Sequence, residues 1–143
     1  MVCEKIESCK VTYTKTRHTF TDNKGCNSKF EILNQNRKEF STYDFENCVF
    51  ENNDTKCDFG LTTLDGIYFI ELKGSETLKG IKQILATYSE TKKCFKQLRP
   101  KARLIVSKVS KPDLVRRSKE YRELARAFNN QILIRQRIYS ETI

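Results

Sequence analysis

The sequence predicts an α/β protein with a central mixed β-sheet flanked by helices. Short apolar or alternating segments in the first half have the period of β-strands. Between residues 75 and 98 apolar side chains recur at helical spacing, and an apolar strand at 102–107 follows. A strand–helix–strand order implies a parallel pair joined by a right-handed crossover.

The predicted strands are short and separated by polar turns. They cover residues 10–14, 28–33, 39–45, 48–50, 57–59, 102–107 and 131–138. Residues 39–45 alternate polar and aromatic side chains, as a half-exposed strand does. The strands at 48–50 and 57–59 are expected to pair across a turn at 52–54. All of residues 1–143 are expected to form one domain, with N-terminal strands at 1–45 and a core at about 45–138.

Two helices are predicted in the second half of the chain. Ser75 or Thr77 can cap the first helix, and Pro100 ends it. Pro112 opens a second helix that runs to about Phe128.

Composition limits the classes of function. With 38% apolar and 31% charged residues, the chain has the composition of a globular domain. It has no 18-residue apolar run and no signal-peptide pattern, so a cytoplasmic protein without a membrane partner is expected. The 6 cysteines show no C-x-x-C spacing, and there is 1 histidine, which argues against a zinc finger. In the cytosol the thiols are expected to be free.

Positive charge is concentrated in the last third. Residues 91–143 carry 15 lysines and arginines against 4 acidic residues, whereas residues 1–90 carry 12 against 14. This asymmetry predicts a nucleic-acid partner, with Arg116, Arg117 and Arg122 as candidate contacts. A solvated helix face that serves solubility is the alternative.

Asp58, Glu71 and Lys73 lie in a predicted β-hairpin with an Asp65-Gly66 turn. That turn would place Asp58 opposite Lys73, with Glu71 on the same face. Burying three charged groups against a core is costly unless they pair with one another or hold a metal. An ordinary cross-strand ion pair on a solvated face is the alternative.

This arrangement resembles the PD-(D/E)xK nuclease superfamily, which includes restriction endonucleases and Holliday-junction resolvases. The matching elements are Asp58 at a strand start and Glu71-Leu72-Lys73 on the next strand. The resemblance implies a restriction-endonuclease-like core. The proline of the motif is replaced by Cys57. The helix that usually begins the core is not predicted here, and Glu46 is the nearest candidate for its acidic residue.

The resemblance also implies a metal site. Asp58, Glu71 and the carbonyl oxygen of Leu72 would bind Mg²⁺, with Glu46 as a further ligand and Mn²⁺ as a substitute. Such an ion lowers the pKa of bound water and neutralises charge on phosphate oxygens. Lys73 would orient or deprotonate the attacking water, or stabilise the transition state.

Gln83 lies on the helix after the motif, where superfamily members often place a polar residue that faces the site. Some members carry Gln-x-x-x-Tyr there, but Tyr88 is one position too far along. A solvated helix residue is the alternative for Gln83. Lys79 and Lys82 on the same helix are candidate phosphate contacts.

The predicted function is that of a magnesium-dependent endonuclease, acting on DNA rather than RNA. Cleavage of both strands of a duplex by so small a core would imply a homodimer. Two alternatives stay open: a non-catalytic nucleic-acid-binding protein, and a defence- or toxin-type subunit that retains the nuclease fold.

Overall fold

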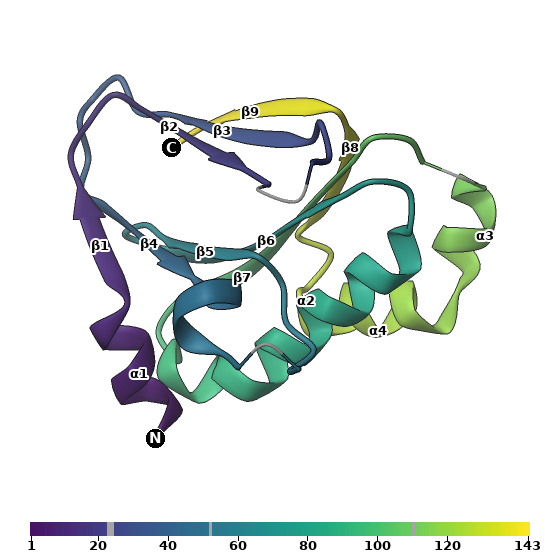
Figure 1. The fold of residues 1–143 in the computed structure, drawn as a ribbon, viewed down its shortest axis with the longest axis horizontal. Coiled ribbons are helices and arrows are strands. Elements are labelled where there is room, and N and C mark those ends of the chain that lie inside the picture. Colours follow the sequence, from purple (N-terminus) through teal and green to yellow (C-terminus); the bar gives the residue numbers. More distant parts are fainter. Residues whose placement is uncertain (23–24, 52, 110) are drawn as a thin grey trace.

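The computed structural model describes residues 1–22, 25–51, 53–109 and 111–143. It shows a mixed α/β protein with a six-stranded sheet, a three-stranded sheet and helices (Figure 1). The elements in chain order are α1 (Val2–Ser8), β1 (Lys10–Tyr13), β2 (Arg17–Thr21), β3 (Lys29–Leu33), β4 (Phe40–Asp44), η1 (Phe45–Val49), β5 (Phe59–Thr62), β6 (Gly66–Lys73), α2 (Thr77–Thr91), η2 (Lys92–Cys94), β7 (Arg99–Val106), α3 (Pro112–Arg117), α4 (Lys119–Ala127), β8 (Ile132–Gln136) and β9 (Ile138–Thr142).

The larger sheet has the strand order β1-β4-β5-β6-β7-β8. In this sheet β1, β4, β5 and β6 pair antiparallel with one another in that order, whereas β6, β7 and β8 pair parallel. Helix α2 makes the crossover from β6 to β7. The predicted mixed sheet with its parallel crossover is therefore confirmed.

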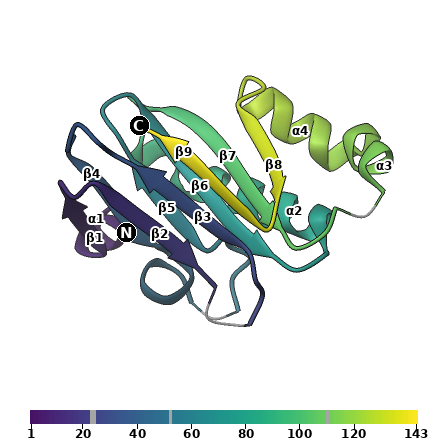
Figure 2. The same cartoon turned by 90° about the horizontal axis from the view of Figure 1, so that it is seen from above.

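The smaller sheet lies over one face of the larger sheet, and the helices cover the other face (Figures 1 and 2). Its order is β2-β3-β9, with β9 parallel to β3. Each face of the larger sheet is thus covered by apolar side chains of another layer. Successive residues of β6 enter different cores: Phe69 packs on the helix side, and Ile70 packs between the sheets. By this alternation Glu71 and Lys73 point to the helix side.

The hairpin turn differs from the prediction. The backbone N–H of Thr63 donates to the carbonyl of Gly66 at 2.9 Å, so Leu64 and Asp65 form the tip of the loop. Gly66 belongs to β6 and pairs with Arg99 of β7. The Asp65-Gly66 turn is wrong because pairing with the parallel neighbour draws Gly66 into the strand.

The register of the hairpin changes with the turn. Phe59 faces Ile70, so the same register places Asp58 beside Glu71 rather than opposite Lys73. The difference amounts to two positions on the partner strand. All three side chains therefore stay on the predicted face, because side-chain direction repeats every two residues.

Two segments of the first half were predicted wrongly. Residues 48–50 form no strand. Cys48 and Val49 are the last two residues of the π-helix η1, and Phe50 is its C-cap. At the other end of η1, the side chain of Asp44 caps the helix. A helix, α1, begins the chain where none was predicted. The predicted turn at 52–54 includes Asn52, which lies outside the described residues.

The helices of the second half are shorter than predicted. Helix α2 ends at Thr91, its N-cap Glu76 makes no side-chain capping bond, and Pro100 lies inside β7. The helix that Pro112 opens is interrupted at Ser118, which is extended and caps α4. The predicted last strand is likewise divided at Arg137, where a φ of 64° turns the chain from β8 into β9.

Four of the six cysteines form disulfides, so the expectation of free thiols is wrong for them. Cys3 bonds to Cys94 and Cys9 bonds to Cys48, whereas Cys26 and Cys57 are free. Both bonds fasten α1, which the sequence pattern did not reveal, to later parts of the chain. Across the described residues, no helix is long and apolar enough to cross a membrane.

Candidate active site

Asp58, Glu71 and Lys73 meet on the helix-facing side of the larger sheet. Asp58 directly precedes β5, and the other two end β6. The exposed fraction is 8% for Asp58 and 2% for Glu71. A cross-strand ion pair on a solvated face is therefore excluded, because both carboxyl groups lie inside the protein.

Backbone hydrogen bonds across the hairpin fix both carboxyl groups. The N–H of Asp58 donates to Oε1 of Glu71 at 3.0 Å, and the N–H of Leu72 donates to Oδ2 of Asp58 at 2.9 Å. Nζ of Lys73 lies 3.5 Å from Oε2 of Glu71. Each acidic side chain is thus held by the strand that carries the other one.

The electrostatics of the site favour protonated carboxyl groups. Burial raises the pKa of Glu71 well above its usual range; Asp58 raises it further, and Lys73 offsets part of the increase. Burial also raises the pKa of Asp58, against the opposing effect of the Leu72 N–H. Two acidic groups held so close together would be stabilised in their charged form by a cation.

Glu46 lies beside Asp58. The backbone N–H groups of Phe45 and Glu46 donate to the carbonyl oxygen of Asp58 at 3.0 and 3.3 Å. The carboxyl group of Glu46 lies near that of Asp58 and contributes to the raised pKa of Asp58. Asp22 also raises that pKa by its charge. Sequence reasoning missed Asp22 because it follows β2, a strand that the pattern did not reveal.

The oxygen donors of the site suit a hard divalent cation. Glu46, Asp58 and Glu71 offer carboxylate oxygens, which Mg²⁺ and Mn²⁺ prefer. Within the described parts of the chain, no three acidic, thiol or imidazole groups stand together as a complete ligand cluster. A cation would therefore draw the carboxylates closer, and Glu46 is the least buried of the three.

Cys57 has a structural reason to occupy the motif's proline position. Its buried backbone N–H donates to Oγ1 of Thr87 on α2 at 2.7 Å. Proline has no N–H and could not make this bond. The hydroxyl group of Thr87 in turn donates to the carbonyl of Gln83 at 2.9 Å. The segment that leads into the β5–β6 hairpin is thereby tied to α2.

Helix α2 packs directly against the site. Nε2 of Gln83 donates to the carbonyl of Lys56 at 3.0 Å, and Oε1 of Gln83 is buried without a hydrogen-bond partner among the described residues. Gly80 permits the close approach, because a Cβ there would lie 3.3 Å from Cγ of Lys73 and 2.7 Å from Cδ1 of Leu104. Gln83 is thus a half-buried neighbour of the hairpin and not a solvated residue.

The candidate phosphate contacts lie away from Asp58, Glu71 and Lys73, on exposed parts of the helices. They are Lys79 and Lys82 on α2, Arg116 and Arg117 on α3, and Arg122 on α4. The beginning of α2 and α3 border a hollow of about 390 Å³, which Lys79 and Lys111 line.

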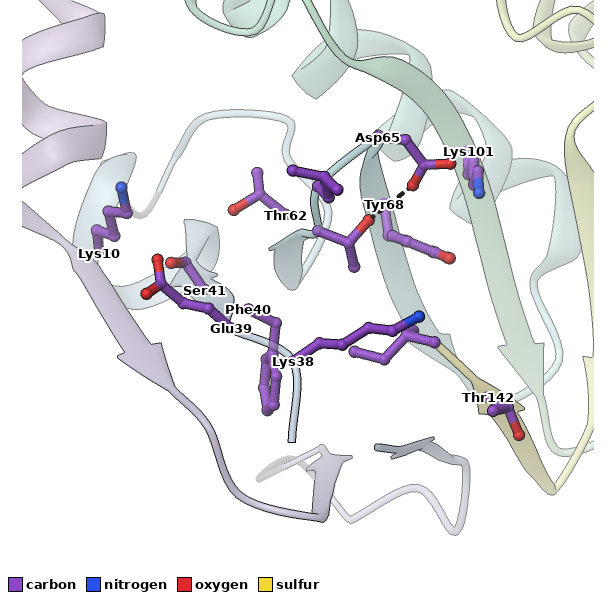
Figure 3. A pocket seen from close by; sticks show the side chains of 13 residues that line it. Lys10, Lys38, Glu39, Phe40, Ser41, Thr62, Asp65, Tyr68, Lys101 and Thr142 are labelled. Carbon is purple, nitrogen blue, oxygen red and sulfur yellow. Dashed lines mark hydrogen bonds between the residues drawn. The ribbon is translucent and has the colours of Figure 1, made fainter. Parts of the chain in front are cut away.

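A larger hollow, of about 880 Å³, lies elsewhere (Figure 3). It lies near the beginning of β6, where Lys38, Phe40, Tyr68 and Lys101 line it. Tyr68 packs toward the smaller sheet, opposite to the side that Glu71 faces. Asp58, Glu71 and Lys73 therefore lie outside this cavity.

Comparison with protein-family models, with curated proteins and with solved structures gave no match.

Proposed function

We propose that the protein is a metal-dependent nuclease with a PD-(D/E)xK-type site. The carrying observation is the pair of buried carboxyl groups, Asp58 and Glu71, hydrogen-bonded across one hairpin beside Lys73. In their charged forms the two buried carboxylates outnumber the one ammonium group, so a cation would be needed to keep both of them ionised.

The order of elements supports a restriction-endonuclease-like core. Strands β4, β5 and β6 form an antiparallel meander, α2 crosses over, and β7 joins parallel to β6. In the resembled superfamily the Asp stands at a strand start and the Glu-x-Lys lies on the next strand. Asp58 directly precedes β5, and Glu71 and Lys73 lie at the end of β6, which fits that pattern.

The site residues would divide the chemistry of phosphodiester hydrolysis. Asp58, Glu71 and Glu46 would hold Mg²⁺ or Mn²⁺, and the carbonyl oxygen of Leu72 would complete the protein ligands. The bound ion would lower the pKa of the attacking water and neutralise charge on the phosphate. Lys73 would orient that water or take up its proton, since its Nζ lies beside Glu71.

DNA is the proposed substrate. The basic residues on α2, α3 and α4 would contact phosphates, which give affinity without sequence information. A chain of 143 residues leaves little beyond the core for reading bases. A homodimer would supply one site for each strand of a duplex.

The cytoplasmic location expected from the sequence stays a prediction. The two disulfides count against it, because such bonds persist mainly in oxidising compartments. Trapping the thiols of the protein directly in cells and counting the modified cysteines would decide this point.

A cleavage assay tests the proposed function. The purified protein is incubated with Mg²⁺ and single-stranded, duplex or branched DNA, and with RNA of the same sequence. We expect cleavage of DNA that Lys73→Met lowers by at least about a hundredfold. Lys10→Met is the matched control, because Lys10 lies outside the proposed phosphate contacts and its Nζ forms an exposed ion pair with Glu7 at 3.7 Å. Binding of DNA without cleavage would favour the non-catalytic nucleic-acid-binding protein.

A further inference from the structure

The π-helix η1 brings Glu46 to Asp58. The backbone N–H groups of Phe45 and Glu46 both donate to the carbonyl of Asp58, at 3.0 and 3.3 Å, which brings the carboxyl group of Glu46 near that of Asp58. The helix has 5 residues, and the N–H of Phe50 closes its turn onto the carbonyl of Phe45 at 3.0 Å. So short a helix has little stability of its own, so its position depends on its attachments.

The attachments of η1 differ between its two sides. Phe45 and Val49 enter the core, where they are 0% and 9% exposed. Glu46 is half-buried and Cys48 is exposed on the other side. There the disulfide from Cys48 reaches Cys9, a buried residue between α1 and β1. Because β1 pairs with β4, this bond ties the outer side of η1 to the larger sheet.

We infer that the Cys9–Cys48 disulfide is a positioning element of the metal site, which holds Glu46 against Asp58 and makes metal affinity depend on the redox state of this bond. The inference rests on the proposed function, because Glu46 matters here as a metal ligand. A dithiol would reduce the bond to two thiols and would itself be oxidised to a disulfide. Cys48 is exposed, so a reductant can reach it. Without this bond, η1 would be less firmly attached on its outer side. The Glu46 carboxylate would then occupy the ligand position for a smaller fraction of the time.

The second disulfide provides a matched control. Cys3–Cys94 fastens the same helix, α1, but to η2 instead of η1. It spans 91 residues, against 39 for Cys9–Cys48. Loop-closure entropy therefore predicts that its loss lowers the melting temperature at least as much. A purely structural role for both bonds would make metal affinity follow stability, whereas positioning of Glu46 separates the two quantities.

The experiment compares Cys9→Ser/Cys48→Ser with Cys3→Ser/Cys94→Ser. Calorimetry measures Mn²⁺ binding without nucleic acid, and NMR measures exchange of the Phe45 and Glu46 amide hydrogens. In the first variant we expect Mn²⁺ affinity to fall roughly tenfold or more, the usual effect of losing support for a ligand. The same two amides should exchange faster. The second variant should change neither quantity by more than about twofold, although it melts at a lower temperature.

A third variant and a reductant refine the test. In a Glu46→Gln background, removing the Cys9–Cys48 bond should weaken Mn²⁺ binding no further, because the ligand is already lost. In Cys3→Ser/Cys94→Ser, a dithiol reduces the remaining disulfide and should reproduce the loss of affinity.

Two results would overturn the inference: equal loss of affinity in both disulfide variants, or unchanged amide exchange and affinity in the first. A wild type that binds no Mn²⁺ and cleaves nothing would instead overturn the proposed function. The amide exchange rates would still show whether the bond positions η1.

Discussion

The backbone N–H of Asp58 donates a 3.0 Å hydrogen bond to the carboxyl group of Glu71, its neighbour on the adjacent strand. Glu71 thus acts as an acceptor that fixes the start of β5, apart from any role as a metal ligand. An amide oxygen can accept the same bond. Substitution by glutamine therefore separates the charge of Glu71 from its structural role.

Glu71→Gln should stabilise the protein in the absence of metal, increasingly so as pH rises. The pKa of Glu71 in the folded state is raised above its unfolded value. Between these two pKa values the folded state binds more protons, so the wild type loses stability as pH rises from about 4. The substitution abolishes that loss. We expect a gain on the order of 1 to 3 kcal/mol in unfolding free energy at pH 8 and almost none at pH 4.

Urea unfolding of both proteins between pH 4 and pH 8 measures this difference. The loss of a partner for Lys73, whose side chain is 17% exposed, reduces the gain but not its sign. Glu76→Gln is the control, because Glu76 is exposed at the N-cap of α2 and should show no such trend. A difference that is constant over this pH range would contradict the raised pKa.

Thr87→Val should destabilise the protein by about 1 to 3 kcal/mol, because it leaves the buried N–H of Cys57 without an acceptor. The side chain keeps its shape, so little packing is lost. Thr91→Val is the matched control. Thr91 is also fully buried, but its hydroxyl group only donates to the carbonyl of Thr87 in the preceding turn, at 2.7 Å. Chemical unfolding should therefore show the smaller loss for Thr91→Val, and the reverse order would refute this account of Cys57.

The sequence predicted the sheet of the second half well, because β6, α2 and β7 have strong local patterns. It also predicted that Asp58, Glu71 and Lys73 share one face, because side-chain alternation survives a register error of two positions. The turn itself was wrong because Gly66 pairs with Arg99 of β7, a contact between distant parts of the sequence.

Other features depend on contacts that no local pattern contains. Helix α1 is held by two disulfides to Cys48 and Cys94, and spacing alone does not specify cysteine pairing. The π-helix η1 was mistaken for a strand because Val49 and its neighbours are apolar, although they follow a wide helical turn. The proximity of Glu46 to Asp58 follows from that turn and could not be predicted without it.

DNA binding should weaken when charge is reversed at Arg116, Arg117 and Arg122. These side chains are exposed on α3 and α4, where they would contact phosphates. Each lost phosphate contact should reduce the slope of log affinity against log salt by roughly 0.9. Fluorescence anisotropy with several unrelated duplexes measures the slope, and the effect should be similar for all sequences.

Charge reversal at Lys5, Lys10 and Lys38 is the control for this experiment. These residues are also exposed, they lie in the first third of the chain, and their reversal changes the net charge by the same amount. If net charge alone governed the affinity for DNA, the two triple variants would bind DNA equally weakly. That outcome would rule out a binding face on α3 and α4.

The central claim is that Asp58 and Glu71 form a metal site. Thermal melts with divalent ions test this claim most directly. Without metal, burial and mutual proximity disfavour the charged forms of the two carboxyl groups, whereas a bound ion would stabilise these charged forms and, by linkage, the folded state. We predict that Mg²⁺ and Mn²⁺ at millimolar concentration raise the melting temperature of the wild type but not of Asp58→Asn. Ca²⁺ should raise it without supporting cleavage, because its looser coordination positions the water poorly. A wild-type melting temperature that ignores all three ions would contradict the metal site and favour non-catalytic binding of nucleic acid.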